Sequence, residues 1–286
     1  MPEPVKMPIK PVRRRIDLTA IGGPAIALAG VLGGLILERG QISDLAQWTA
    51  LLIVVGGTLG AVVASTPPGN LRSAARRCRS LLFGGAANYQ NTADNVMHFV
   101  LLARRGGVVS METQAEKVQD PFLRKALLLA VDGADASEIR AQLELTVRRE
   151  EERAEADARV FENAGGYAPT VGIIGAVLGL IQVMKQLDDI GQVGRGVAVA
   201  FVATIYGVGL ANLLLLPAAA RIRTVARHES LRHELITEGV LAIAKGLNPH
   251  LVKMRLENFL EPKTGRAEKA VQPAEIAPPV ETRYVA

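Results

Sequence analysis

The sequence predicts an all-α integral membrane protein: four transmembrane helices, a helical cytoplasmic insertion between the second and third, and a cytoplasmic C-terminal helix. Three observations favour this class. Hydrophobic residues make up 49% of the 286 residues but aromatic residues only 4%, so Ala, Val, Leu and Ile supply the apolar content. Four apolar runs are long enough to cross a bilayer. Helical periodicity dominates the polar stretches between and after these runs.

The four apolar runs cover residues 18–37, 48–65, 167–184 and 196–217, and none contains a charged side chain. Three arginines, residues 13–15, precede the first run, as basic residues precede a signal peptide. The run is too long for a signal peptide and shows no clear cleavage signal, so we expect an uncleaved span. The spans form two membrane segments, residues 18–66 and 164–220.

Positive charges near the span ends indicate the orientation. The N-terminal segment 1–17 is basic, and arginines follow the second and the fourth span. The connections 38–47 and 185–195 are short and roughly neutral. Because basic residues collect on the cytoplasmic side, both termini and the long middle segment are expected in the cytoplasm. The clusters also suit lipid headgroups and account for the net charge of +5, so no nucleic-acid binding is expected.

The cytoplasmic insertion is expected at 67–163, with helices over 95–105, 120–133 and 136–164. The charged run 149–159 is expected to be mainly a solvated face, although a docking surface is an alternative. After the fourth span, residues 221–261 predict a long amphipathic helix that ends at Gly246 and a short helix that follows. Residues 262–286 are rich in Pro and Ala and predict a disordered tail.

No catalytic or metal-binding pattern is found. His228 and His233 are five residues apart and point in different directions on a helix. With Glu229 and Glu234 nearby, they predict a solvated face and no metal site. The glycine-rich run 172–179 has no Walker lysine and follows no strand. The single cysteine, Cys78, excludes an internal disulfide and a thiolate zinc site. The chain is therefore not expected to be an enzyme or to hold a metal or other cofactor.

Small residues recur four apart in every span, and such spacing lets helix backbones approach closely in lipid. They either pack the four spans on each other or provide a surface for a partner or a passage. The pairs and the triplet are Gly30–Gly34, Gly56–Gly60, Gly175–Gly179 and Ala203–Gly207–Ala211. Two prolines lie near the span ends, Pro169 and Pro217. They act either as ordinary helix-end prolines or as points where helices flex.

Residues 167–219 and 231–260, including the run E-G-V-L-A-I-x-x-G-x-N-P at Glu238–Pro249, resemble the MotA family of flagellar stator proteins. The resemblance covers nearly the whole chain. It implies a homo-oligomeric ring in the bacterial inner membrane, a pentamer in this family, around a MotB-like single-span partner anchored to peptidoglycan. It further implies that ions cross where the two proteins meet and that the ring pushes on the rotor protein FliG.

The resemblance also implies site residues. Pro169 and Pro217 match the family prolines that couple ion flow to rotation. Charged residues that face the rotor match Arg104 and Glu112, with Arg105 and Glu116 close by. The ion-binding carboxylate belongs to the partner's helix, and this chain lines the pathway with Ala176, Ala203, Thr204 and Tyr206.

The identity of the ion follows from the same comparison. Sodium-driven relatives carry threonines where this chain has Ala176 and Ala203, and sodium needs several oxygen ligands. Thr204 is the one hydroxyl left, and it serves either the pathway or a bond to its own helix carbonyl. The sequence therefore predicts a proton channel.

Two other functions remain open. The first is a proton channel of the related ExbB/TolQ group, which energises outer-membrane processes; three spans and a different loop order are typical of that group. The second is a non-conducting membrane scaffold, in which the small-residue seams serve only assembly. Ion conduction upon co-expression with the partner distinguishes a channel from a scaffold.

Overall fold

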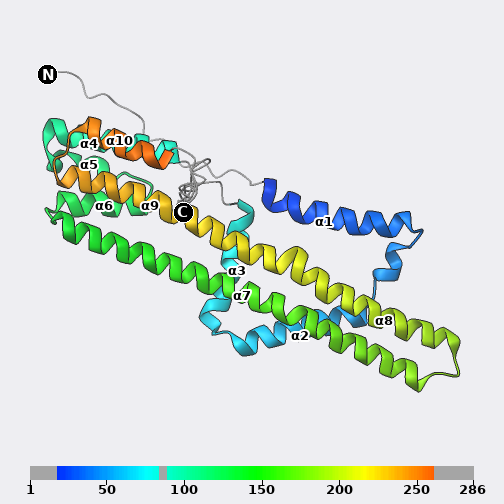
Figure 1. Ribbon diagram of the computed structural model, residues 1–286. Helices are drawn as coiled ribbons and strands as arrows, with labels where there is room; N and C mark the ends of the chain where they lie inside the picture. Colours follow the sequence, from blue (N-terminus) through cyan, green and yellow to red (C-terminus); the bar gives the residue numbers. More distant parts are fainter. Residues whose placement is uncertain (1–17, 84–88, 261–286) are drawn as a thin grey trace, which may run out of the picture.

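The computed structural model describes residues 18–83 and 89–260, and every element in these ranges is a helix (Figure 1). The expected N-terminal segment 1–17 and the expected tail 262–286 lie outside the described residues. In chain order the elements are α1 (Leu18–Leu37), η1 (Ile42–Leu45), α2 (Trp48–Ser65), α3 (Pro68–Phe83), α4 (Tyr89–Gly106), η2 (Val108–Met111), α5 (Glu112–Ala115), α6 (Pro121–Val131), α7 (Ala136–Lys185), α8 (Ile190–Gly209), η3 (Leu210–Leu215), α9 (Leu216–Ala244) and α10 (Pro249–Leu260). The first two η elements are 3-10 helices, and η3 is a π-helix.

Two long helical rods lie side by side and form the frame of the molecule (Figure 1). One rod is α7, with 50 residues, and the other runs from α8 through η3 into α9. The N-cap of α7 is Asp135, whose carboxylate accepts the backbone N–H groups of Ser137 and Glu138 at 2.7 and 2.9 Å. The helix then continues past residue 164, so the third span and the charged run before it form one element.

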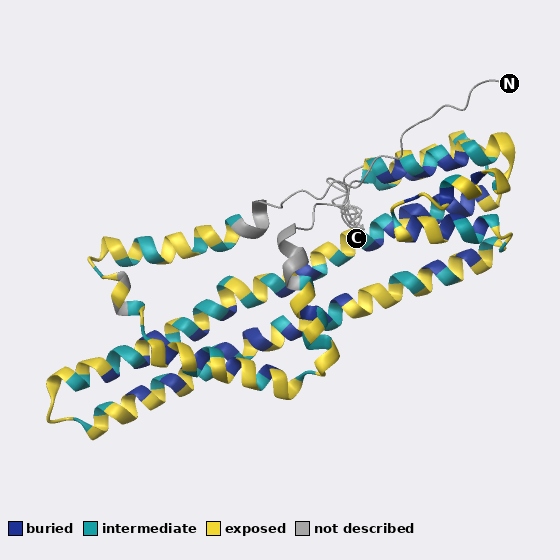
Figure 2. Cartoon of the chain, turned by 180° about the vertical axis from the view of Figure 1, so that it is seen from behind, coloured by how far each residue is buried: buried dark blue, intermediate teal, exposed yellow. Residues whose placement is uncertain are grey.

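Among the described residues, three helices are long and apolar enough to cross a membrane: α2, α7 and the α8–α9 rod. In α1, residues Gly22–Leu37 form a shorter apolar helix. At most 28% of the apolar window of each long helix is buried, and Figure 2 shows exposed and half-buried residues all along these parts. Apolar surface of this kind suits contact with lipid or with other membrane helices.

At the other end of the rods, α4, α5, α6, α10, the start of α7 and the end of α9 form the distal bundle (Figure 1). Its core is the largest group of buried apolar side chains among the described residues. The largest of them are fully buried: Phe99, Met111, Leu123, Leu127, Ile139, Leu143, Leu235, Ile236 and Leu256. This core holds the two rods together at one end.

The run Glu238–Pro249 has a structural role in the distal bundle. Glu238 pairs with Arg140 of α7 at 2.7 Å, and a Cβ added to Gly239 would lie 2.1 Å from the Val96 side chain, so α4 and α9 need a glycine at this contact. Gly246 ends α9 with a φ of 64°, a conformation that favours glycine. The Asn248 side chain then accepts the His250 N–H and caps α10.

The small residues of the third and fourth spans pack against each other. A Cβ added to Gly207 would lie 2.5 Å from the Ala168 carbonyl oxygen, and one added to Gly175 would lie 2.8 Å from the Ala203 methyl group. Backbones can approach this closely only where side chains are absent or small. Internal packing is therefore found for the seams of the third and fourth spans. A Cβ added to Gly30, Gly34, Gly56 or Gly60 in the first two spans would meet nothing within 4 Å.

Helix α3, which the sequence analysis did not predict, fixes α2 to the middle of α7. Asp157 of α7 is 1% exposed, and its carboxylate accepts bonds from Arg77 Nε at 2.7 Å and from the Ser73 hydroxyl at 3.1 Å. A buried carboxylate requires such partners because burial removes its hydration. The charged run 149–159 is thus more than a solvated face, because part of it binds α3.

Candidate functional site

The uncharged stretch of α8 that the sequence analysis placed along an ion pathway packs against α2. Ala203 is fully buried together with Ala50 and Val54 of α2. Thr204 is half-buried, and its hydroxyl donates to the Ala200 carbonyl at 3.2 Å. Of the two uses left open for Thr204, the bond to its own helix is the one found. Ala176 lies half-buried on α7 and also adds no oxygen ligand.

Tyr206 joins α8 to the connection that precedes α2. Its hydroxyl donates to the Leu45 carbonyl and accepts the Gln47 N–H at 3.5 Å. Its ring packs with the buried group of Ala50 and Val54. The side chain therefore holds the start of α2 against the middle of α8, in addition to any contact with ions.

Replacing Tyr206 by phenylalanine is expected to destabilise the protein by about 1 kcal/mol, because the Leu45 carbonyl loses its donor. This corresponds to a fall in Tm of about 2–4 °C for a chain of this size. Thermal unfolding of the solubilised protein measures the change. Tyr167→Phe is the control, since the Tyr167 hydroxyl bonds to no other described residue. An unchanged Tm for Tyr206→Phe would show that the bond contributes nothing.

Pro169 and Pro217 lie where α7 meets the α8–α9 rod. Pro169 is inside α7, and Pro217 is the second residue of α9. The turn before Pro217 is the π-helix, in which the Leu216 N–H donates to the Ala211 carbonyl five residues back. The Leu216 side chain packs on Gly165, one turn before Pro169. Since proline has no N–H, α7 remains α-helical but lacks the bond to the Gly165 carbonyl, while the other rod widens into the π-helix at this level.

The four charged residues expected at the rotor lie on or next to α4 and α5, in the distal bundle, which is at the opposite end of the rods from the apolar spans (Figure 1). Arg104 and Arg105 form the last turn of α4, Glu112 begins α5, and Glu116 follows α5. The chain turns between the two pairs at Gly107, whose φ is 79°. All four side chains are exposed, so they are available to a partner.

Sequence reasoning missed a charged cluster at the junction of α6 and α9. The Arg232 guanidinium pairs with Asp120 and with Glu229, and its side chain is only 11% exposed. Asp120 is also the N-cap of α6, because its carboxylate accepts the N–H groups of Phe122 and Leu123. The Asp-Pro start of α6 was visible in the sequence, but its partner on α9, more than a hundred residues away, was not.

The solvated face expected for His228 and His233 is wrong for His233. That residue is 4% exposed, and its ring stacks on Phe122 of α6 with 3.8 Å between the ring centroids. Its Nδ1 atom lies 3.3 Å from the Glu150 carboxylate of α7. Three elements therefore meet around one imidazole. His228 is exposed and contacts the Tyr89 hydroxyl at 3.0 Å.

The cluster makes stability depend on pH in the acid range. Burial alone would raise the pKa of the Glu229 carboxyl, but bonds from His233 and Arg232 lower it from 4.5 to about 2. A lowered folded-state pKa contributes stability that is present above the unfolded value of 4.5 and lost as the pH falls toward 2. We expect Tm to fall over this window, and Glu229→Gln to flatten the dependence. Equal slopes for both proteins would exclude Glu229 as the cause.

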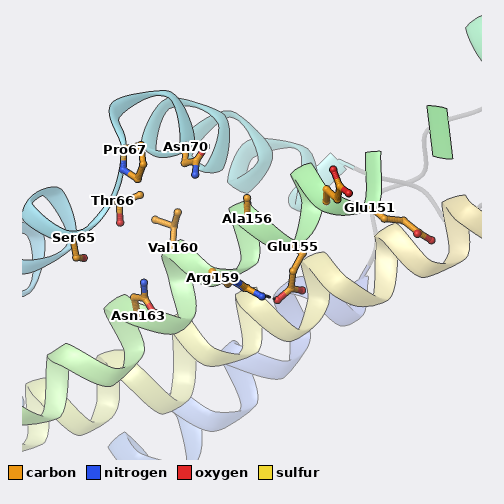
Figure 3. Close-up of a pocket in the computed structure, with 11 residues that line it drawn as sticks. Ser65, Thr66, Pro67, Asn70, Glu151, Glu155, Ala156, Arg159, Val160 and Asn163 are labelled. Carbon is orange, nitrogen blue, oxygen red and sulfur yellow. Dashed lines mark hydrogen bonds and ion pairs between the residues drawn. The ribbon is translucent and has the colours of Figure 1, made fainter. Parts of the chain in front are cut away.

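A polar cleft of about 570 Å³ lies between the α2–α3 corner and α7 (Figure 3). Hydroxyl and amide groups line one side, among them Thr66 and Asn70, and charged side chains of α7 line the other. Arg159 bonds Glu155 across the helix surface at 3.2 Å, and Glu155 also binds Arg223 of α9 at 2.9 Å. Within residues 18–83 and 89–260 no three His, Cys, Asp or Glu side chains are placed to hold a metal ion.

These features define a class: a helical membrane protein whose spans offer small, uncharged side chains and whose distal bundle presents exposed charges. Comparison with known proteins identifies the family. Residues 114–235 match the model of the MotA/TolQ/ExbB proton channel family, and residues 21–106 match the motility protein A N-terminal model. The chain therefore belongs to the MotA/TolQ/ExbB proton channel family.

Motility protein A of Bacillus subtilis (strain 168) is 33% identical over 252 residues, which are 87% of this chain and 92% of the relative. The structure of C. jejuni MotAB superposes with a TM-score of 0.83 at 28% identity and covers 89% of this chain and 100% of that chain. The flagellar MotAB stator complex from Bacillus subtilis gives 0.78 at 32% identity, covering 85% and 96%. These matches confirm the MotA resemblance of the sequence.

Proposed function

We propose that the chain is the MotA-type subunit of a flagellar stator and that, with a MotB-like partner, it converts proton flow into torque on the rotor. The observation that carries this proposal is the full-length likeness to MotAB stator subunits, including a motility protein A N-terminal region at 21–106. That region favours the flagellar function over the ExbB/TolQ alternative. Conversion of proton flow into torque requires no catalysed reaction by this chain, so we propose that it is not an enzyme.

The topology proposed is four spans with both termini in the cytoplasm of the inner membrane. Helices α1 and α2 form the first membrane segment, 18–66, and the ends of α7 and the α8–α9 rod form the second, 164–220. The segments on the cytoplasmic side are 1–17, 67–163, 221–261 and 262–286. The basic residues Arg72 and Arg76 on α3 support this orientation, since both are exposed next to the end of α2 and suit anionic lipid headgroups.

The partner is needed because this chain provides no charge inside its spans. An ionisable group in a membrane is costly and marks an ion pathway, yet the apolar runs contain none. A carboxylate on the single span of a peptidoglycan-binding, MotB-like protein completes the pathway, and a ring of this chain, a pentamer in this family, surrounds it. The exposed apolar side chains of α7, such as Ile174 and Leu178, suit contacts within such a ring or with lipid.

Charge reversal tests the contact with FliG. Arg104→Glu is expected to weaken torque partially without lowering the amount of protein in the membrane, because one exposed pair contributes only about 0.2–1 kcal/mol. An opposite charge introduced on the rotor protein should restore part of the torque. Tethered-cell rotation under load measures the effect. Normal torque in the double variant Arg104→Glu, Glu112→Lys would remove both residues from the interface.

Conduction separates the proposed channel from a scaffold. Co-expression with the MotB-like partner is expected to acidify the cytoplasm when the membrane is energised, and a scaffold would leave the internal pH unchanged. The same measurement in cells that lack the partner is the control.

A further inference from the structure

Between the spans and the distal bundle, little apolar packing joins α7 to α9. At the spans, Leu216 of α9 packs on Gly165 of α7, and toward the distal bundle Glu150 of α7 lies 3.3 Å from His233 of α9. Over the roughly 15 residues between these contacts, α7 rises about 22 Å. Part of its surface here lines the polar cleft (Figure 3). Among the described residues, the buried apolar cluster that joins the two helices in this stretch consists of one large and two small side chains, Ile222, Ala154 and Ala158.

Arg223 of α9 bridges the two helices in this stretch with all three nitrogens of its guanidinium. Its Nε and Nη2 atoms donate to the Glu155 carboxylate at 2.9 and 3.0 Å. Its Nη1 and Nη2 atoms donate to the Glu162 carboxylate at 3.4 and 2.6 Å. Because the guanidinium is a planar fork of donors, one side chain of α9 binds two carboxylates that lie two turns apart on α7.

The bridge is part of a network of four charges. Arg159 also donates to Glu155, at 3.2 Å, so two arginines face two glutamates and their formal charges cancel. Bonds from Arg223 lower the pKa of Glu155 and that of Glu162, so both carboxylates stay ionised at neutral pH. A single exposed ion pair stabilises little, but a bidentate arginine within a network is an exception. The network therefore holds the middle of α9 at a fixed level on α7.

We propose that Arg223 is a positioning residue for torque generation: by binding Glu155 and Glu162 together, it makes α7 and α9 move as one body when the helices shift near the two prolines. Pro169 lies seven residues after Glu162, and Pro217 lies six residues before Arg223. Two helices joined in the middle bend less under load than either helix alone, so a displacement at the prolines reaches the distal bundle with less loss. The inference rests on the proposed function, because it concerns how the stator transmits force.

Stall torque and proton influx, measured on the same variants, test this role. Arg223→Gln removes the charge and the fork, and it is expected to leave influx with the MotB-like partner near the wild-type level but to lower stall torque by about half or more. Arg223→Lys keeps the charge on a single ammonium that cannot bind both carboxylates in this geometry, so an intermediate torque is expected. Arg140→Gln is the matched control. It breaks another α7–α9 ion pair, 2.7 Å long, to Glu238, at a place where the buried core of the distal bundle already joins the helices.

Unchanged stall torque in Arg223→Gln, or an equal loss in Arg140→Gln, would overturn the proposal. A parallel fall in influx and in membrane content would also overturn it, since Arg223 would then serve assembly. Adding Glu162→Gln to Arg223→Gln is expected to lower torque no further, because both residues belong to one network. Additive losses would contradict that network.

A structural readout tests the bridge without a working motor. Amide hydrogen exchange of residues 150–166 is measured in the solubilised complex with the partner. It is expected to be about threefold faster or more in Arg223→Gln than in the wild type, and unchanged in Arg140→Gln. Equal exchange in all three proteins would overturn the proposal. Wild-type protein that neither conducts protons nor drives rotation would instead contradict the proposed function, whatever the exchange data show.

Discussion

Pro217→Leu is expected to leave the protein in the membrane and the complex assembled, but to reduce motility to a small fraction of the wild-type level. A leucine supplies the N–H that proline lacks and has no ring to press on the Leu213 carbonyl. The cause of the widened π-helix before it is then removed, and η3 can relax toward α-helix. Because Leu215 and Leu216 contact Gly165 of α7, this relaxation changes how the two rods meet.

Swimming speed, membrane content of the protein and co-purification of the partner measure this effect together. Pro249→Ala is the control, since Pro249 begins α10 outside the spans, where a missing N–H costs little. Motility near the wild-type level would mean that Pro217 only marks the start of α9. Loss of the assembled complex would mean that the proline serves folding instead of coupling.

Withdrawal of sodium at constant proton-motive force is expected to leave motor speed unchanged, whereas collapse of the proton gradient stops rotation. Sodium must exchange its hydration shell for several oxygen ligands. Ala176 and Ala203 offer methyl groups, and the Thr204 proton is already donated to the Ala200 carbonyl. A proton needs only a carboxylate and a path of water.

Motor speed is recorded at graded external sodium while the membrane potential and the pH difference are held fixed. This measurement distinguishes proton-driven from sodium-driven rotation. The control repeats the series with a protonophore at high sodium. Rotation that stops without sodium, or that persists at high sodium after the protonophore, would overturn the proton prediction and require oxygen ligands from the partner.

The sequence was sufficient for features that depend on local patterns. The uncharged apolar runs correctly predicted the apolar helical stretches of α2, α7 and the α8–α9 rod, and Gly246 correctly marked the end of α9. Even here the uninterrupted length of α7 was not predicted. The sequence around Gly165 and Gly166 indicates a break by helix propensity, but packing of Gly165 on Leu216 compensates for it.

Features that depend on distant partners were not accessible from the sequence. His233 looked solvated because Glu229 and Glu234 are its neighbours, yet Phe122 and Glu150, on two other helices, enclose it. Tyr206 was assigned to the ion pathway, and its bonds to the start of α2 could not be foreseen because they join positions about 160 residues apart. The charges proposed to face the rotor were assigned only through family resemblance, since exposed charges show no pattern of their own.

The uninterrupted course of α7 has a mechanical consequence. At 1.5 Å per residue, its first residue lies about 50 Å from Pro169, so a tilt of only about 5° at the proline would swing that end by about 4 Å. In the proposed topology the helix is a lever whose short arm, after Pro169, lies in the membrane and whose long arm, before Pro169, lies outside it. A small displacement at the level of Pro169 would arrive enlarged at the first turns of α7, where Ile139 and Leu143 pack in the core of the distal bundle. Because α7 is one continuous helix from its first residue to Pro169, a tilt at the proline moves that end without a second hinge. A substitution that makes this part of α7 more flexible would reduce the displacement of its end.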